Sequence, residues 1–189
     1  QLVTSPILSV EVEYSGRVLE HDIAPITRTL LKGLFEPVLK EGVNYVNATH
    51  IARERRIQVI ETKKAEPENF TSLIILRVKT KDGTNSVGGA IFGKSEPRIV
   101  RINDVFLDAI PQGPILIVHN YDRPGVIGNI GTLLGKNNVN INRFQLGLAK
   151  GSDIATSLIN LDSPVPGKIL EEIRKLPNIV SATQVVLHA

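Results

Sequence analysis

Hydrophobic and polar residues alternate along the first part of the chain in a way that predicts strands around one long helix. Alternation over residues 7–14 is typical of a half-buried strand. Apolar residues over 25–40 recur every three or four positions, which indicates an amphipathic helix with Gly42 at its end. A shorter helix is expected over 48–55. Four strand-like runs follow at 57–62, 73–80, 86–92 and 99–102, with a hairpin turn at Lys81-Asp82-Gly83.

The chain changes character at Ile110-Pro111-Gln112-Gly113-Pro114, where two prolines and a glycine predict a domain boundary. We therefore expect two small domains, residues 1–112 and 113–189. In the second, strands are expected at 115–119, 139–148, 154–160 and 179–187, and helices at 124–136 and 165–176. The order β-α-β-β-α-β is that of a ferredoxin-like fold. The predicted fold class is thus α/β (α+β), with an α/β domain followed by a ferredoxin-like domain.

Composition narrows the chemistry that the chain can carry. The chain contains no cysteine, which excludes disulfides, zinc-thiolate sites, iron–sulfur ligation and a cysteine nucleophile, and fits a cytoplasmic protein. No apolar run approaches the roughly 20 residues of a membrane span, so no membrane association is expected. The chain does not begin with methionine and contains none, and we expect it to be a piece of a longer polypeptide.

The net charge of +3 raises the question of nucleic-acid binding. Residues 1–112 hold 15 basic and 14 acidic side chains, and residues 113–189 hold 7 and 5, so neither half is a basic patch. Aromatic residues make up only 4% of the chain, too few to provide stacking platforms for single strands. We therefore expect no nucleic-acid partner.

Signatures of catalysis and of metal binding are absent from the sequence. A nicotinamide-binding fold needs G-x-G-x-x-G between a strand and a helix, and Gly88, Gly89 and Gly93 do not have that spacing. The four histidines are scattered without metal-ligand spacing. We expect no catalytic residue, no metal and no cofactor in this fragment.

The richest polar segment runs from His119 to Gly128, where a strand ends and a helix is expected to start at Pro124. Free backbone N–H groups at a helix start bind carboxylates, and the carboxylate of Asp122 suits an ammonium group. Together these groups match an α-amino acid. The alternative is that Asp122 only caps the helix and that Gly125 and Gly128 ease packing.

Longer stretches of the chain resemble a known family. Asp122-Arg123-Pro124-Gly125-Val126-Ile127-Gly128, with G-T-L-L-G and N-V-N-I after it, resembles the ACT domain of D-3-phosphoglycerate dehydrogenases. ACT domains are small amino-acid sensors appended to metabolic enzymes. The segments L-K-G-L, G-V-N-Y-V-N-A and F-G-K-S-E-P-R-I-V, all before residue 101, resemble the intervening, or allosteric substrate-binding, domain of the same enzymes.

The resemblance implies a regulatory role for this chain. The parent enzyme would be an NAD-dependent, cytoplasmic oxidoreductase of serine biosynthesis, with its catalytic domains outside this fragment. L-serine would bind between ACT domains of two subunits of a homo-oligomer (a dimer or tetramer) and inhibit the enzyme by feedback. The residues implied for serine are Asn120, Asp122, Gly125, Val126 and Ile127, with Asn140 contributed across the interface.

Some family members also hold an anion in the intervening domain. Lys94, Arg98 and Arg101 are the candidates here, and Arg98 matches a basic position of the family. Two further positions that are basic in the family are Ile110 and Asn160 in this chain, which counts against a shared mode of binding. The alternative is that these cations form a solvated surface.

Two other functions fit the same sequence. An ACT domain without a ligand would be a structural module that only holds subunits together. The β-subunit of an iron–sulfur L-serine dehydratase shares both domains, and the long match in F-G-K-S-E-P-R-I-V-R-I favours the dehydrogenase over it.

Overall fold

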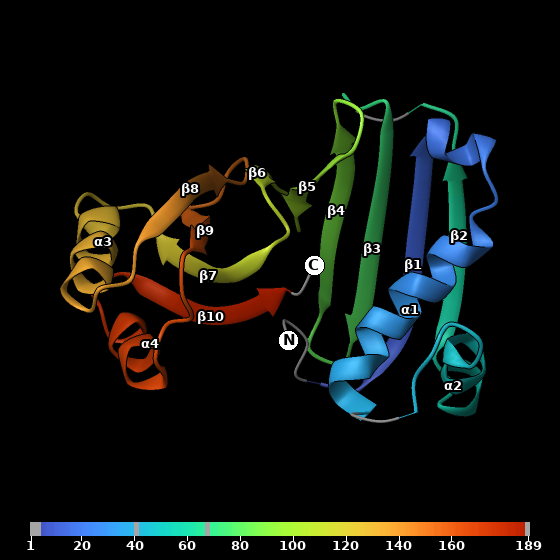
Figure 1. Cartoon of the computed structure of the whole chain (residues 1–189), viewed down its shortest axis with the longest axis horizontal. Helices are drawn as coiled ribbons and strands as arrows, with labels where there is room; N and C mark the ends of the chain where they lie inside the picture. Colours follow the sequence, from blue (N-terminus) through green and yellow to red (C-terminus); the bar gives the residue numbers. More distant parts are fainter. Residues whose placement is uncertain (1–4, 40–41, 67–68, 188–189) are drawn as a thin grey trace. The chain divides into compact units, whose positions relative to one another are not determined.

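The computed structural model describes residues 5–39, 42–66 and 69–187. The chain folds into two compact units, Gln1–Glu96 and Pro97–Ala189, each with its own sheet and helices (Figure 1). The predicted mixed α/β class is confirmed.

The first unit is a sheet with two helices on one face (Figure 1). Its strands lie in the order β2-β1-β3-β4, with β1 parallel to β2 and antiparallel to β3. The two helices lie between β1 and β2 in the sequence, and they form the crossover connection that a parallel pair of strands requires. The elements of this unit are β1 (Ile7–Gly16), a 3₁₀ turn (Arg17–Glu20), α1 (Ala24–Leu39), α2 (Ala48–Glu54), β2 (Gln58–Lys64), β3 (Ser72–Thr80) and β4 (Thr84–Phe92).

The two faces of β1 carry different chemistry because its side chains alternate. Val10, Val12 and Tyr14 are fully buried in a core beneath the helices, with Leu31 and Phe35 of α1. The hydrophobic stripe predicted for residues 25–40 is therefore the face by which α1 packs on the sheet. Pro37 lies inside the last turns of α1.

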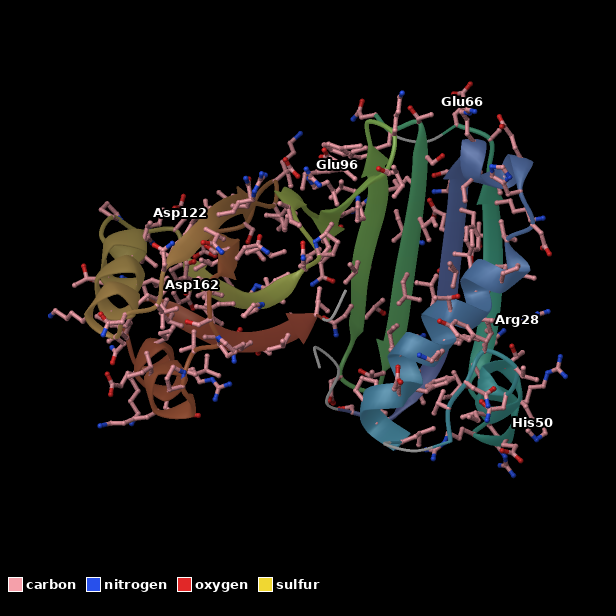
Figure 2. All side chains as sticks on the ribbon, in the orientation of Figure 1. Arg28, His50, Glu66, Glu96, Asp122 and Asp162 are labelled. Atoms are coloured by element: carbon pink, nitrogen blue, oxygen red, sulfur yellow. The ribbon has the colours of Figure 1, made fainter. Side chains whose placement is uncertain are left out.

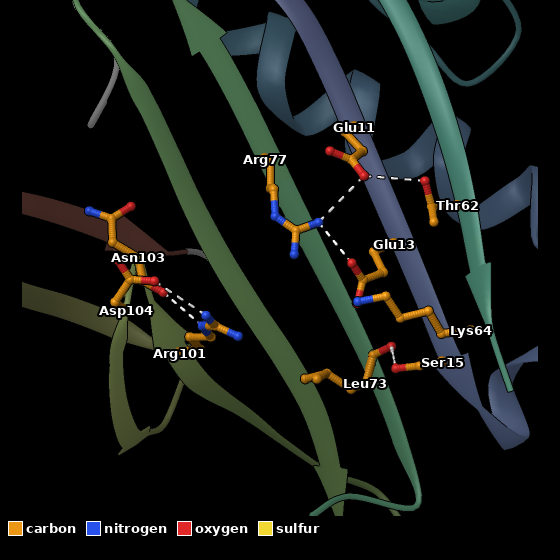
Figure 3. Close-up of polar contacts among 10 residues, drawn as sticks. All are labelled: Glu11, Glu13, Ser15, Thr62, Lys64, Leu73, Arg77, Arg101, Asn103 and Asp104. Carbon is orange, nitrogen blue, oxygen red and sulfur yellow. Dashed lines mark hydrogen bonds and ion pairs between the residues drawn. The ribbon is translucent and has the colours of Figure 1, made fainter. Parts of the chain in front are cut away.

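The opposite face of this sheet holds a polar cluster (Figure 3). Arg77 of β3 donates from Nη1 to Glu13 at 2.9 Å and lies 3.6 Å from Glu11, both on β1. Lys64 of β2 contacts the other Glu13 oxygen at 2.9 Å. Thr62 donates to Glu11 at 3.2 Å. Glu13 is only 6% exposed, so its charge is compensated by two cations from the neighbouring strands.

The second unit contains a ferredoxin-like domain, as predicted. Its four strands lie in the order β10-β7-β9-β8, all antiparallel, and α3 and α4 share one apolar core with the sheet (Figure 1). Buried Leu116 and Val118 of β7 meet Ile130 and Leu134 of α3 and Ile173 of α4 there. The elements are β7 (Gly113–Tyr121), α3 (Val126–Lys136), β8 (Ile141–Leu148), β9 (Ile154–Leu161), α4 (Gly167–Arg174) and β10 (Ile179–Leu187).

A hairpin precedes this domain within the second unit. It consists of β5 (Glu96–Ile102) and β6 (Val105–Ala109), and the sequence pattern did not predict β6. Asp108 of β6 lies 3.5 Å from Arg143 of β8, and the Asn160 amide of β9 donates to the Ile110 carbonyl at 2.9 Å. These contacts place the hairpin against β8 and β9. The domain boundary that the sequence predicts between residues 112 and 113 stays a prediction. The two compact units are divided at a different place, between Glu96 and Pro97.

Candidate functional site

The start of α3 is the first part of the candidate site. Gly125 precedes the helix with φ 90° and ψ −16°, a left-handed conformation that glycine adopts without strain. No side chain caps the helix, and α3 begins at Val126, two residues after the predicted start at Pro124. Among the described residues, the amides of Ile127 and Gly128 have no acceptor. Amides of this kind bind anionic groups.

Asp122 lies in the loop that leads from β7 to this helix start (Figure 2). Its backbone N–H donates to the Asp153 carbonyl at 2.8 Å, which ties the loop to the start of β9. Its side chain is exposed, and the carboxylate has no hydrogen bond or ion pair within the described part of the chain. The alternative that Asp122 caps the helix is therefore wrong.

Asn120 lies on β7, on the face that the helices cover, because it continues the alternation of Leu116 and Val118. The side chain is only 1% exposed. Its Nδ2 donates to the Tyr121 carbonyl at 2.9 Å, whereas its Oδ1 is buried without a hydrogen-bond partner among the residues described. Buried acceptors usually have a hydrogen-bond partner. The Oδ1 atom of Asn120 is therefore an acceptor that a ligand could use, two residues before Asp122.

The remaining two residues of the helix start differ in exposure. Val126 is 3% exposed and belongs to the core, whereas Ile127 is 52% exposed. The side chain of Val126 is therefore closed to a ligand, and its N–H donates to the Arg123 carbonyl at 3.5 Å. Ile127 presents both its amide and an apolar side chain at the surface.

Asn140 is not brought to this end of the sheet. It precedes β8, its N–H donates to the Asp162 carboxylate at 2.9 Å, and its Nδ2 donates to Asn142 at 3.3 Å. Ile141 pairs with Leu161 at one end of β9, whereas Tyr121 pairs with Ile154 at the other. Seven residue steps of about 3.3 Å put the two ends roughly 23 Å apart. Within one chain, Asn140 and Asp122 therefore belong to opposite ends of the sheet.

Two of the three predicted anion-binding residues, Arg98 and Arg101, are engaged with acidic or backbone partners. Arg98 lies with its Nε 3.1 Å from Asp108, and its Nη1 donates to the Pro97 carbonyl at 3.0 Å. Arg101 donates to the Asn103 carbonyl at 2.7 Å and lies 3.3 Å from Asp104 (Figure 3). Lys94 is exposed in the turn between β4 and β5. The two arginines thus face different carboxylates.

One ionic cluster was missed by sequence reasoning. Asp108 lies between Arg98 of β5 and Arg143 of β8, so one carboxylate faces two guanidinium groups. Asp108 is on β6, the strand that was not predicted. The sequence signal for this strand was Asn103-Asp104 between two short apolar runs, because asparagine and aspartate suit a tight hairpin turn. In the structure Asn103 has the positive φ, 50°, that such a turn uses.

His119 lies next to the candidate site on the opposite face of β7. Its Nδ1 is 3.0 Å from the Thr156 hydroxyl of β9. Burial lowers the pKa of His119 below the usual histidine range. Burial therefore favours the neutral form of the ring.

Within the described ranges, no helix is long and apolar enough to cross a membrane. The same residues contain no group of three or more histidine, aspartate or glutamate side chains placed to hold a metal ion.

Comparison with known proteins places the chain in a family. The model of the D-3-phosphoglycerate dehydrogenase intervening domain matches residues 1–103, and the ACT-domain model matches residues 115–178. The chain belongs to the family of D-3-phosphoglycerate dehydrogenase intervening domains, joined to an ACT domain. The intervening-domain match thus includes β5, and the ACT-domain match includes the whole candidate site.

Curated relatives agree with this assignment. The D-3-phosphoglycerate dehydrogenase of Archaeoglobus fulgidus is 38% identical over 96% of this chain and 34% of its own length. Those of Methanocaldococcus jannaschii and Synechocystis are 34% and 37% identical over 95% and 99% of this chain. The chain spans about a third of the length of these relatives. Among solved structures, the ACT domain of the Chlorobium tepidum GTP pyrophosphokinase covers 43% of the chain at 18% identity, with a TM-score of 0.32.

Proposed function

We propose that this chain is the regulatory part of a cytoplasmic, NAD-dependent D-3-phosphoglycerate dehydrogenase and that its ACT domain binds L-serine. The observation that carries the proposal is that, among the described residues, the exposed carboxylate of Asp122 and the amides of Ile127 and Gly128 have no partner, and that Asp122 lies in the loop leading to this helix start. The amides suit the carboxylate of an amino acid, and Asp122 suits its ammonium group. The serine hydroxyl is left for the amide groups of Asn120 and Asn140.

The site requires two copies of the chain. Asn140 lies at the far end of the sheet from Asp122, so its carboxamide reaches the ligand only from a second ACT domain. Serine bound in this way would favour one arrangement of two subunits over others. That differential affinity is what feedback inhibition of the distant catalytic part requires, typically about 1–3 kcal/mol of coupling.

Calorimetric titration with L-serine, with glycine and D-serine as controls, tests the proposal. We expect saturable binding that Asp122→Ala and Asn140→Ala each abolish. Glu171→Ala is a matched control, because it removes a carboxylate of the same unit that pairs with Arg174 on α4, away from the candidate site. No binding by a folded oligomer at millimolar serine would leave the structural module as the better description.

Mixing the two variants tests whether the site is shared. Equal amounts of the Asp122→Ala and Asn140→Ala chains should recover about a quarter of the sites, because each mixed pair contains one intact site and one doubly altered site. A site built within one chain would recover nothing on mixing. That result would overturn the shared site while leaving serine binding itself intact.

The β-subunit of an iron–sulfur L-serine dehydratase is the competing enzyme. The intervening-domain model and the three relatives above carry the dehydrogenase name. These matches support the dehydrogenase as the parent enzyme.

A further inference from the structure

The first unit contains a cavity of about 490 Å³ between α1, α2 and β2. Each element presents one face to it: Arg28 comes from α1, Thr49 and Arg53 lie one turn apart on α2, and Val59 and Glu61 alternate on β2. Ligand sites for small molecules span roughly 300–1,000 Å³. The size of the cavity is thus that of a small-ligand site, and all of its lining belongs to the first unit.

The cations of this cavity are not neutralised by their neighbours. Within the described part of the chain, the side chains of Arg28 (Figure 2) and Arg53 make no ion pair and no hydrogen bond. Glu54, next to Arg53, instead contacts the His50 ring at 3.1 Å on a different side of α2. Two guanidinium groups from two helices therefore line one cavity without a bound carboxylate.

Glu61 is the acidic residue of the lining, and a buried hydrogen-bond chain holds it. The Thr27 hydroxyl, 6% exposed, donates to the Glu61 carboxylate, and the Tyr14 hydroxyl lies 2.8 Å from the same Thr27 oxygen. Since Thr27 donates its proton to Glu61, Tyr14 must donate to Thr27. Burial raises the pKa of Tyr14, which keeps that donor protonated. Glu61 is thus fixed at the wall, and the lining keeps a net positive charge.

We propose that this cavity binds a small anion through its carboxylate or phosphate group, held between Arg28 and Arg53. Guanidinium groups match both kinds of anionic group with paired hydrogen bonds. The Thr49 hydroxyl provides a further donor, and Val59 provides an apolar wall for a carbon skeleton. This site is in the intervening domain and shares no residue with the site proposed for serine, so each can fail without the other.

Calorimetric titration of the chain at low ionic strength tests this site, with inorganic phosphate and with glycolate as separate probes. We expect saturable binding of at least one probe with one site per chain. Arg28→Gln and Arg53→Gln should each raise the dissociation constant about tenfold or more, because each removes a charge-assisted contact. Binding of phosphate alone or of glycolate alone supports the site and identifies the anionic group.

Two further variants separate a built site from diffuse attraction. Arg55→Gln removes the same charge two residues from Arg53, outside the lining, and should leave binding within about twofold. Glu61→Gln keeps an acceptor for Thr27 but removes a negative charge, so it should tighten binding. Circular dichroism checks that each variant is folded, and Arg28→Lys and Arg53→Lys, which keep the charge but lose the paired geometry, replace any that is not.

Absence of saturable binding for both probes would overturn the proposal. So would an equal loss in Arg55→Gln and Arg53→Gln, since it would indicate general attraction to a basic surface. Chemical-shift changes on titration should map to α1, α2 and β2. Changes confined to the second unit would also overturn it.

Discussion

A Cβ atom at Gly147 would lie 2.7 Å from the carbonyl oxygen of Phe106, and it would also collide with the Val105 side chain. The two strands β6 and β8 therefore approach each other where position 147 has no side chain. This close approach joins the hairpin of β5 and β6 to the ACT-domain sheet.

Substitution of Gly147 should therefore destabilise the second unit. We expect Gly147→Ala to lower the free energy of unfolding by about 2 kcal/mol, because the backbone of β6 must shift to admit the methyl group. Urea denaturation measures the change. Gly135→Ala is the matched control, because nothing lies within 4 Å of a Cβ there and alanine favours a helix, so it should stabilise by about 0.5–1 kcal/mol. Equal behaviour of the two variants would contradict the close approach.

Asp122 and Asp162 should respond differently to loss of the carboxylate. Asp122→Ala should change the free energy of unfolding by less than about 0.5 kcal/mol, because its side chain caps nothing. Asp162→Ala should cost about 1 kcal/mol, because this carboxylate accepts the Asn140 N–H at 2.9 Å and the Ser163 hydroxyl at 3.0 Å. Thermal or urea unfolding without serine gives both values. A loss of about 1 kcal/mol for Asp122→Ala would indicate a capping role after all.

Glu13 should make the first unit sensitive to acid. Burial raises the pKa of Glu13, but the hydrogen bonds and charges of Lys64 and Arg77 outweigh it and hold the pKa below the usual range. The folded state thus binds a proton less readily than the unfolded chain does. The stabilisation is present above the usual glutamate pKa and is lost as the pH falls through the lowered value.

The variant Glu13→Gln isolates this effect. At pH 7 it should cost about 2 kcal/mol, since it removes a charge-assisted pair of contacts, and the difference from the parent chain should shrink below pH 4. Denaturation of the variant and the parent chain at pH 7 and at pH 3 measures this difference in the free energy of unfolding. A cost that is the same at pH 7 and pH 3 would mean that the ion pairs contribute little and that the shape of the side chain matters instead.

His119 should contribute a second dependence on pH in the second unit. Burial lowers its pKa, so the unfolded chain takes up a proton at a higher pH than the folded chain does. Stability should therefore fall as the pH drops from 7 through the usual histidine range, until the lowered pKa is passed. We expect His119→Gln to flatten the stability profile between pH 7 and 5. An unchanged slope in the variant would assign the effect to another group.

Sequence patterns predicted the elements well where periodicity and turn chemistry agree. The stripe of residues 25–40 became α1, and Lys81-Asp82-Gly83 became the turn between β3 and β4. The start of α3 was placed two residues too early, because Pro124 suits a first turn, whereas Gly125 takes a left-handed conformation that delays the helix. The short strand β6 was not predicted, because its five residues are too few to show a clear hydrophobic periodicity.

The candidate sites show where local pattern stops being informative. The sequence places Asn120 and Asp122 next to each other, but only the register of β7, β8 and β9 shows that Asn140 lies at the opposite end of the sheet. The residues of the first-unit cavity are spread from α1 to β2, and their meeting depends on how α1 and α2 pack. Spacing predicts which residues share a face, and it does not predict which faces meet.

Because Asp122 and Asn140 lie at opposite ends of one sheet, the number of ligands bound per chain would depend on how the chains assemble. In the proposed serine site, each copy would contribute two complementary half-sites, one at each end of its sheet. A closed two-fold pair matches every half-site, so it holds one ligand per chain. An open head-to-tail row always leaves one unmatched half-site at each end, so its ratio stays below one and rises as the row lengthens. Counting bound serine against chain concentration would therefore distinguish a closed assembly from a growing one without any image of it.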